Sequence, residues 1–281
     1  MGEFASCPPQ AVKAAEVICG PVKLKAITDR RGSAVWKATG PMAAVAIKLG
    51  TGAAAEVTAR EASVLDQLPG YTVTAGRASE AVWFVTPWLN GQSTWDLFRA
   101  AREGAAGRPT ALAGAVDLCR AVAGLHATGW VHGDLQPTHG LHTRMGVKLI
   151  DFAWSWQAGT TPWTVFEGAI VHLMAPELAA WIAAGPQPVK TTRAAEVYAL
   201  AGVLWTCATG GWPLDYRAAG IDRKEAGAEG LRDAIATGKL PLSLATPWPE
   251  LQDVLRPVLL SGPADRPTAS ELAVALVAVS R

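Results

Sequence analysis

The stretch His132–His139 reads HGDLQPTH, and the stretch Asp151–Ala153 reads DFA. Between them, Val147–Ile150 is short and apolar, which is typical of a buried strand. Asp151 therefore ends a predicted strand, where a carboxylate facing a cleft is a suitable hard-oxygen ligand for Mg²⁺. Asp134 lies within the first stretch. Its side chain could simply cap a turn, but the apolar and proline neighbours in the stretch weaken that interpretation and favour a functional role.

Further motifs surround these two stretches in a fixed order. Val45–Lys48 reads VAIK, and Glu61 opens an amphipathic run downstream of it. Met174–Glu177 reads MAPE, and Asp265–Thr268, near the end, reads DRPT. In composition and order these motifs resemble those of protein kinases, over nearly the whole chain.

The resemblance implies an ATP-dependent phosphotransferase and gives each motif residue a role. Lys48 would contact the α- and β-phosphates, and Glu61 would pair with Lys48. Glu56 is the competing partner on the same predicted helix, and Glu61 is preferred because a core-facing apolar stripe follows it. Asp134 would be the catalytic base, and His132 would be structural.

The cofactors implied are ATP with Mg²⁺ or Mn²⁺. Asp151 would hold metal, with His139 at the position of a second metal ligand. The late Arg266 is expected to pair with Glu177. The residues expected at the adenine ring and the hinge are Val35, Ala46, Thr86, Trp88, Leu89 and Leu141.

The predicted elements favour an α+β, bilobal protein kinase-like fold, with a β-rich N-lobe and a larger helical C-lobe. The predicted strands are Val22–Thr28, Ala34–Lys37, Ala43–Leu49, Thr72–Gly76 and Ala81–Val85, with one helix near Ala53–Leu68. The later predicted helices are Thr94–Arg102, Thr110–Thr128, Ala194–Thr209, Leu251–Leu260 and Ala269–Val279. The expected domains are an N-terminal extension (1–20), the N-lobe (21–86), a hinge (87–90) and the C-lobe (91–281), with the nucleotide in a cleft between lobes.

Composition narrows the function classes. Half of the 281 residues are apolar and the formal charge is +1, so neither a nucleic-acid partner nor an anionic membrane is indicated. The four cysteines are scattered without metal-ligand spacing and are expected to be reduced thiols. The absence of a signal-peptide pattern predicts a cytoplasmic protein. Met1–Ser6 fits an N-myristoylation pattern and also a cloning remnant, so both interpretations stay open.

The chain departs from the kinase pattern at several positions. Thr28, Arg30 and Ser33 stand where the phosphate-covering loop should have glycines, which predicts weaker nucleotide affinity. His139 replaces an Asn, and imidazole suits Mn²⁺ better than Mg²⁺. Gly133 replaces the usual Arg; Gln136 and Ala153 also depart from the pattern.

The acceptor class is open at this point. The leading hypothesis is a Ser or Thr hydroxyl of a peptide or protein. The sequence HGDLQPTH also resembles the kinase-like components of lanthipeptide maturation, in which a separate lyase eliminates the phosphate. The alternatives are a small-molecule, aminoglycoside-type phosphotransferase and a pseudokinase that binds a peptide or partner enzyme. Trp154, Trp156 and Trp163 are interpreted as packing anchors, with a peptide groove as the alternative.

Overall fold

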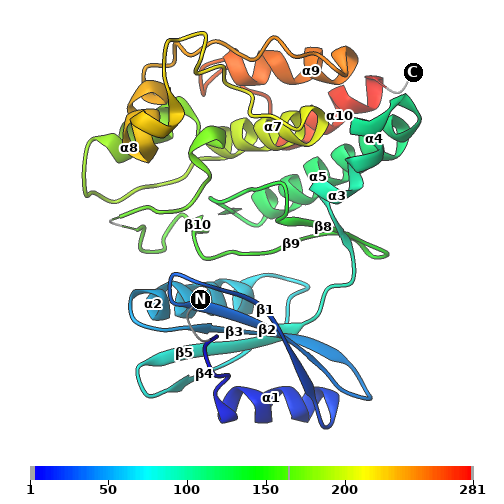
Figure 1. Ribbon diagram of the computed structural model, residues 1–281, viewed down its shortest axis with the longest axis vertical. Helices are drawn as coiled ribbons and strands as arrows, with labels where there is room; N and C mark the ends of the chain where they lie inside the picture. The colour runs from blue at the N-terminus through cyan, green and yellow to red at the C-terminus, as the bar shows by residue number, and fades with distance from the viewer. Residues whose placement is uncertain (1–3, 164, 280–281) are drawn as a thin grey trace. The chain divides into compact units, whose positions relative to one another are not determined.

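The computed structural model describes residues 4–163 and 165–279, so Met1–Glu3 of the candidate lipidation segment lie outside the described residues. The chain divides after Asn90 into two compact units (Figure 1). The first unit is an antiparallel sheet with helices, and the second is mainly helical. The α+β prediction is therefore confirmed.

The first unit contains a five-stranded antiparallel sheet with the strand order β1-β2-β3-β5-β4. Its elements are α1 (Pro9–Cys19), β1 (Lys23–Arg30), β2 (Ser33–Thr39), β3 (Ala44–Gly50), α2 (Ala53–Gln67), β4 (Thr74–Ala78) and β5 (Ala81–Pro87). In Figure 1, α1 and α2 lie on opposite faces of this sheet. Residues 9–19, expected to be part of an extension, thus form a helix packed within the unit.

Alternation along the central strand explains this packing. Val45, Ile47 and Leu49 of β3 are buried in one apolar cluster with the small residues of α1, which are Ala11, Ala15 and Cys19. Because successive side chains of a strand point to opposite faces, Ala46 and Lys48 lie on the other face. Both are only partly buried. The face that carries Lys48 is therefore the one that α1 leaves uncovered.

The second unit begins with short elements and continues into long helices. The short elements are β6 (Gln92–Ser93), α3 (Thr94–Leu97), α4 (Arg99–Glu103), a 3-10 helix (Ala105–Gly107), β7 (Trp130–Val131), β8 (Gly140–Thr143), β9 (Gly146–Leu149), β10 (Trp156–Gln157) and a second 3-10 helix (Val171–Leu173). The longer helices are α5 (Arg108–Ala127), α6 (Pro176–Ala183), α7 (Arg193–Thr209), α8 (Arg223–Ala236), α9 (Pro249–Leu260) and α10 (Ala269–Val279).

Helix α7 forms the centre of the second unit. It is apolar on nearly all sides, and Leu200, Leu204 and Trp205 are fully buried. The Thr192 side chain caps its start by accepting a hydrogen bond from the Ala195 amide at 3.0 Å. Helices α4, α5 and α9 contact it, and α10 packs on α5. In the part of the chain that the structure describes, every helix is too short or too polar to cross a bilayer.

Candidate active site

Lys48 and Glu61 form an ion pair within the first unit. Lys48 Nζ lies 2.5 Å from Glu61 Oε2, and the Glu61 side chain is only 4% exposed. Glu61 lies in α2 on the side that faces the sheet, whereas Glu56, its sequence competitor, is exposed to solvent. A buried carboxylate requires a charged partner, and Lys48 supplies it. The pair therefore fixes the lysine side chain on the partly open face of β3.

Strand register places the predicted adenine residues of this unit beside Lys48. Val35 of β2 is directly opposite Lys48, and Ala46 is directly opposite Thr86 of β5. Directly opposed residues of an antiparallel pair share a face, so these four side chains line one surface. Trp88 follows β5, and the ammonium group of Lys37 lies 4.5 Å from its ring centroid. Leu89 is partly buried beside it.

The hairpin between β1 and β2 replaces the expected phosphate-covering loop. Arg31 and Gly32 form its two-residue turn, both with positive φ (52° and 77°). Such a turn matches the twist of the two strands that it joins. The Gly32 carbonyl accepts a hydrogen bond from the Thr51 amide at 2.9 Å, and a Cβ on Gly32 would lie 2.9 Å from the Thr51 carbonyl oxygen. The hairpin tip is thus tied to the end of β3.

In the second unit, Asp134 is buried and held by two amide donors. Its Oδ1 accepts hydrogen bonds from Gln136 Nε2 at 2.9 Å and from the Ala169 backbone amide at 2.7 Å. Burial raises the pKa of Asp134, while His139 and the Gln136 amide oppose that rise. In the sequence, Gln136 stood out only as a departure from the kinase pattern. The Ala169 amide was missed, because a backbone donor has no side-chain signature.

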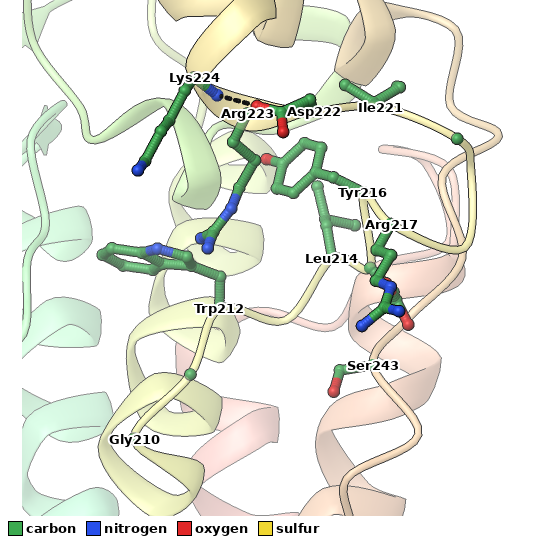
Figure 2. Close-up of a pocket in the computed structure, with 13 residues that line it drawn as sticks. Gly210, Trp212, Leu214, Tyr216, Arg217, Ile221, Asp222, Arg223, Lys224 and Ser243 are labelled. Carbon is green, nitrogen blue, oxygen red and sulfur yellow. Dashed lines mark hydrogen bonds between the residues drawn. The ribbon is translucent and has the colours of Figure 1, made fainter.

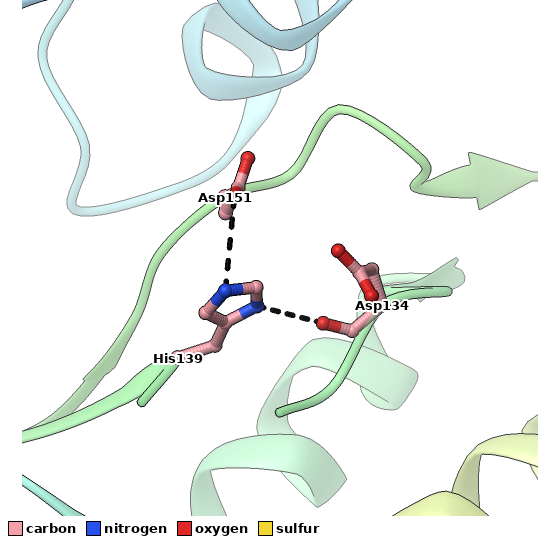
Figure 3. A group of neighbouring side chains, drawn as sticks. All are labelled: Asp134, His139 and Asp151. Carbon is pink, nitrogen blue, oxygen red and sulfur yellow. Dashed lines mark hydrogen bonds and ion pairs between the residues drawn. The ribbon is translucent and has the colours of Figure 1, made fainter. Parts of the chain in front are cut away.

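Asp134, His139 and Asp151 offer ligand atoms that lie within 4.8 Å of one another (Figure 3). His139 Nδ1 lies 2.8 Å from the Asp134 carbonyl oxygen, so Nδ1 carries the proton and donates. Nε2 therefore presents a lone pair, and it lies 3.7 Å from Asp151 Oδ2. A metal-binding imidazole is commonly oriented by such a bond from its other nitrogen. Asp151 adopts a left-handed backbone (φ 68°), which Asp tolerates better than most residues.

These donors fit a divalent metal. Asp151 supplies hard carboxylate oxygens on a side chain that is 38% exposed, and the imidazole of His139 adds a borderline nitrogen ligand.

His132 is fully buried, donating from Nε2 to the Ile150 carbonyl and accepting at Nδ1 from the Asp134 amide. Burial lowers the pKa of His132. Both of its nitrogens are used within the protein, which fits the structural role expected for it.

Gly133 and Glu196 fix the loop that carries Asp134. Gly133 has φ 80°, and a Cβ there would lie 2.5 Å from the Trp154 carbonyl oxygen, so only glycine fits. Glu196 of α7 accepts a hydrogen bond from the Gly133 amide at 2.9 Å. Its other oxygen lies 2.6 Å from His126 Nε2. Sequence reasoning missed His126, whose only signal is a polar residue in the last turn of an apolar helix.

The predicted pair of Arg266 and Glu177 is present and bidentate. Arg266 Nη2 donates to Glu177 Oε2 at 2.9 Å, and Nη1 donates to Oε1. The arginine also binds the carbonyl oxygens of Ala194 and Ser261, each at 3.1 Å. Its side chain is 2% exposed. The pair therefore connects the start of α6 with α7 and with the segment before α10.

A cavity of about 860 Å³ lies near the start of α8 (Figure 2). Its lining residues lie between Gly210 and Ser243, far in the sequence from Asp134 and Asp151. Its lining contains charged side chains of both signs together with aromatic rings, and Figure 2 shows the Arg223 side chain extending toward Trp212. The Trp212 ring is stacked on His172 at 4.6 Å, and His172 Nδ1 lies 3.0 Å from the Tyr216 hydroxyl.

Leu141, the remaining predicted adenine residue, lies in β8 opposite Lys148 and is partly buried.

Comparison with known proteins gives one family. A model of the protein kinase domain matches residues 48–275. No curated protein matches the chain. The match begins at Lys48, so the altered β1–β2 hairpin lies outside it. The match spans most of the chain. It contains the Lys48–Glu61 pair, the cluster of Asp134, His139 and Asp151, and the Arg266–Glu177 pair. The chain therefore belongs to the protein kinase family.

Proposed function

We propose that this chain transfers the γ-phosphoryl group of ATP to a Ser or Thr hydroxyl of a peptide or protein. Kinase chemistry in general follows from the family, and the proposal adds the acceptor class. The observation that carries it is the convergence of Asp134, His139 and Asp151, with the orientation of the imidazole fixed by a hydrogen bond. Three polar side chains gathered at one point suit the binding of a metal and a phosphate group. A purely structural role in the core would favour apolar side chains at these positions.

Asp134 receives or directs the proton of the acceptor hydroxyl in this proposal. Its Oδ1 is occupied by two N–H donors, and its Oδ2 accepts no hydrogen bond from the described residues. Oδ2 is therefore the oxygen available to the hydroxyl, and a positioned carboxylate aligns the attacking oxygen. Lys48, fixed by Glu61, contributes charge to the α- and β-phosphates.

Asp151 and His139 would hold the divalent metal, and Asp134 lies next to them as the base. A bound Mg²⁺ or Mn²⁺ would neutralise charge on the phosphates. The β1–β2 hairpin offers Ser33 or the arginines Arg30 and Arg31 in place of a glycine cradle. We expect weaker ATP affinity than a glycine-rich loop would give, because fewer backbone amides can approach the phosphates.

A ribosomal precursor peptide is the acceptor that the HGDLQPTH loop suggests. In that case a separate lyase would remove the phosphate from the modified Ser or Thr. The phosphotransfer itself requires only that the hydroxyl reach Asp134. A small-molecule acceptor remains the alternative outcome of the test below.

The test is mass spectrometry of candidate acceptors after incubation with ATP and either Mg²⁺ or Mn²⁺. Peptides and proteins with Ser or Thr form one set, and sugars and aminoglycosides form the other. Asp134→Asn keeps the size of the side chain and removes its basicity, so we expect a loss of at least about 100-fold. Asp117→Asn, an exposed carboxylate on α5, is the matched control.

Phosphate gain on peptides that is lost in Asp134→Asn and kept in Asp117→Asn supports the proposal. Phosphate gain on small molecules alone would replace the peptide acceptor with that class. Binding of ATP without transfer to any acceptor would indicate a pseudokinase. Full transfer by Asp134→Asn would remove Asp134 from the role assigned to it.

A further inference from the structure

An aromatic cluster stands beside the catalytic loop and is not used by the proposed function. The Trp154 ring lies 4.8 Å from that of Trp163 and 5.3 Å from that of Phe166, measured between centroids. The Trp154 and Trp163 planes are tilted by 48°, and those of Trp154 and Phe166 meet edge to face at 63°, a favourable geometry. The backbone of Trp163 is itself anchored, because its carbonyl accepts a hydrogen bond from the Val189 amide at 2.8 Å.

The chain then passes directly over these rings. At Gly168, a Cβ would lie 2.5 Å from Trp154 Cγ and 2.8 Å from a carbon of the Phe166 ring. Contacts below 3.0 Å are sterically forbidden, so only glycine allows this approach. The backbone at Gly168 is therefore packed directly against the rings of the aromatic cluster.

The next residue delivers a donor to the catalytic carboxylate. Ala169 has φ 66°, a left-handed conformation that a non-glycine residue rarely adopts. In this conformation its amide donates to Asp134 Oδ1 at 2.7 Å. Such local strain persists only where the surrounding structure fixes it, and here the rings beneath Gly168 do so.

We propose that Trp154 is a positioning residue of the phosphotransfer reaction. Its ring, with those of Trp163 and Phe166, holds the backbone so that the Ala169 amide binds one oxygen of Asp134. The other oxygen is then directed to the acceptor hydroxyl. This inference rests on the proposed function and adds to it a device that orients the base through the backbone.

The expected size of the effect follows from the geometry. A hydrogen bond from an amide to a carboxylate is charge-assisted, and its loss at a reacting group corresponds to about 10- to 100-fold in rate. A misplacement of the base by about 1 Å has an effect of similar size. ATP binding uses other residues, so the effect should fall on kcat and leave the KM for ATP within about twofold.

The first experiment compares two substitutions at Trp154. Trp154→Phe keeps a ring under Gly168, and we expect kcat to stay within about threefold of the wild type. Trp154→Leu keeps apolar volume without the ring, and we expect kcat to fall about 10- to 100-fold. Trp212→Leu is the matched control, because Trp212 is also partly buried and stacked on a ring but lies elsewhere in the unit. We expect no change in kcat for that variant.

The second experiment acts on the donor itself. Incorporation of lactic acid at position 169 replaces the amide N–H by an ester oxygen and leaves the side chain unchanged, and we expect kcat to fall about 10-fold or more. Ala169→Gly keeps the N–H and suits the positive φ, so we expect it to retain full activity. Equal kcat for the ester and the wild type would overturn the role of the amide.

Hydrogen exchange provides a measurement that does not depend on transfer. Amides of residues 167–171 should lose protection in Trp154→Leu and keep it in Trp154→Phe. Unchanged protection in Trp154→Leu would overturn the inference whatever the kinetics show. If the wild type transfers phosphate to no acceptor, the proposed function fails, and this exchange comparison still decides whether Trp154 positions the Ala169 amide.

Discussion

The pair of Arg266 and Glu177 allows a stability prediction with a magnitude. The Arg266 side chain is 2% exposed and that of Glu177 is 28% exposed. Removing one partner of a buried, hydrogen-bonded ion pair typically lowers the free energy of unfolding by about 3–5 kcal/mol. The arginine also serves two backbone carbonyl oxygens, which would lose charge-assisted donors. We therefore expect Arg266→Met to lower the free energy of unfolding by about 4 kcal/mol.

A double-mutant cycle separates the pair from the rest of the arginine. Glu177→Gln keeps the shape of the side chain and removes its charge. For a bidentate pair with one partner fully buried, we expect a coupling energy of about 2–3 kcal/mol between Arg266→Met and Glu177→Gln. Urea unfolding followed by tryptophan fluorescence measures each corner of the cycle.

The same unit contains a control pair. Arg120 and Asp117 lie 3.3 Å apart on α5, with side chains 65% and 54% exposed. An exposed pair of this kind is expected to show a coupling energy below about 0.5 kcal/mol. Coupling between Arg266 and Glu177 as small as that of the surface pair would refute the view that burial gives this ion pair its strength.

Three further predictions concern activity and pH. Glu61→Gln should raise the KM for ATP about tenfold or more because Lys48 loses its buried partner; Glu56→Gln, at an exposed position, should not, and equal effects would contradict the assignment. His139→Asn should lower the ratio of Mn²⁺- to Mg²⁺-supported activity about tenfold, and an unchanged ratio would exclude the imidazole as a ligand. Burial, helped by a nearby arginine, lowers the pKa of His172 to about 4 from an ordinary value of 6.5, so the unfolded chain binds more protons between these values. The contribution of His172 to the free energy of unfolding should be fully present above pH 6.5. It should fall by about 1–2 kcal/mol as the pH is lowered to about 4, after allowance for the partial exposure of His172. Urea titrations of His172→Gln should not show this pH-dependent decrease.

The first unit could be predicted from alternation where side chains are large. The strand expected at Ala43–Leu49 is observed as Ala44–Gly50, because Val45, Ile47 and Leu49 give a clear period of two. Helix α1 escaped prediction, because its buried positions, Ala11, Ala15 and Cys19, are small and give little hydrophobic contrast.

In the second unit, the long apolar helices were predicted and the broken ones were not. The expected helix Thr94–Arg102 is split at Phe98 into α3 and α4. Helix α8 was missed because it is polar and contains Gly227, whose φ of 60° interrupts the helix. These elements depend on tertiary packing, which a periodicity count does not contain.

Side-chain chemistry at the site was easier to predict than its backbone chemistry. Lys48, Asp134 and Asp151 could be singled out because the motifs that contain them resemble those of protein kinases, and their individual roles stay predictions. The amide of Ala169 has no such signature. The proton position on His139 also emerged only from the 2.8 Å contact of Nδ1 with a carbonyl oxygen.

Several residues around Asp134, some of which depart from the kinase pattern, together hold this carboxylate in place. Gly133 gives space to the Trp154 carbonyl, and the Trp154 ring in turn supports the segment whose amide binds Oδ1. Gln136, which also departs from the pattern, donates a hydrogen bond to that same oxygen. Glu196 accepts a hydrogen bond from the Gly133 amide and so holds the same loop. Both printed hydrogen bonds of this buried carboxylate go to Oδ1, and the proposed transfer reaction uses Oδ2, whereas a pseudokinase would have no need of that oxygen.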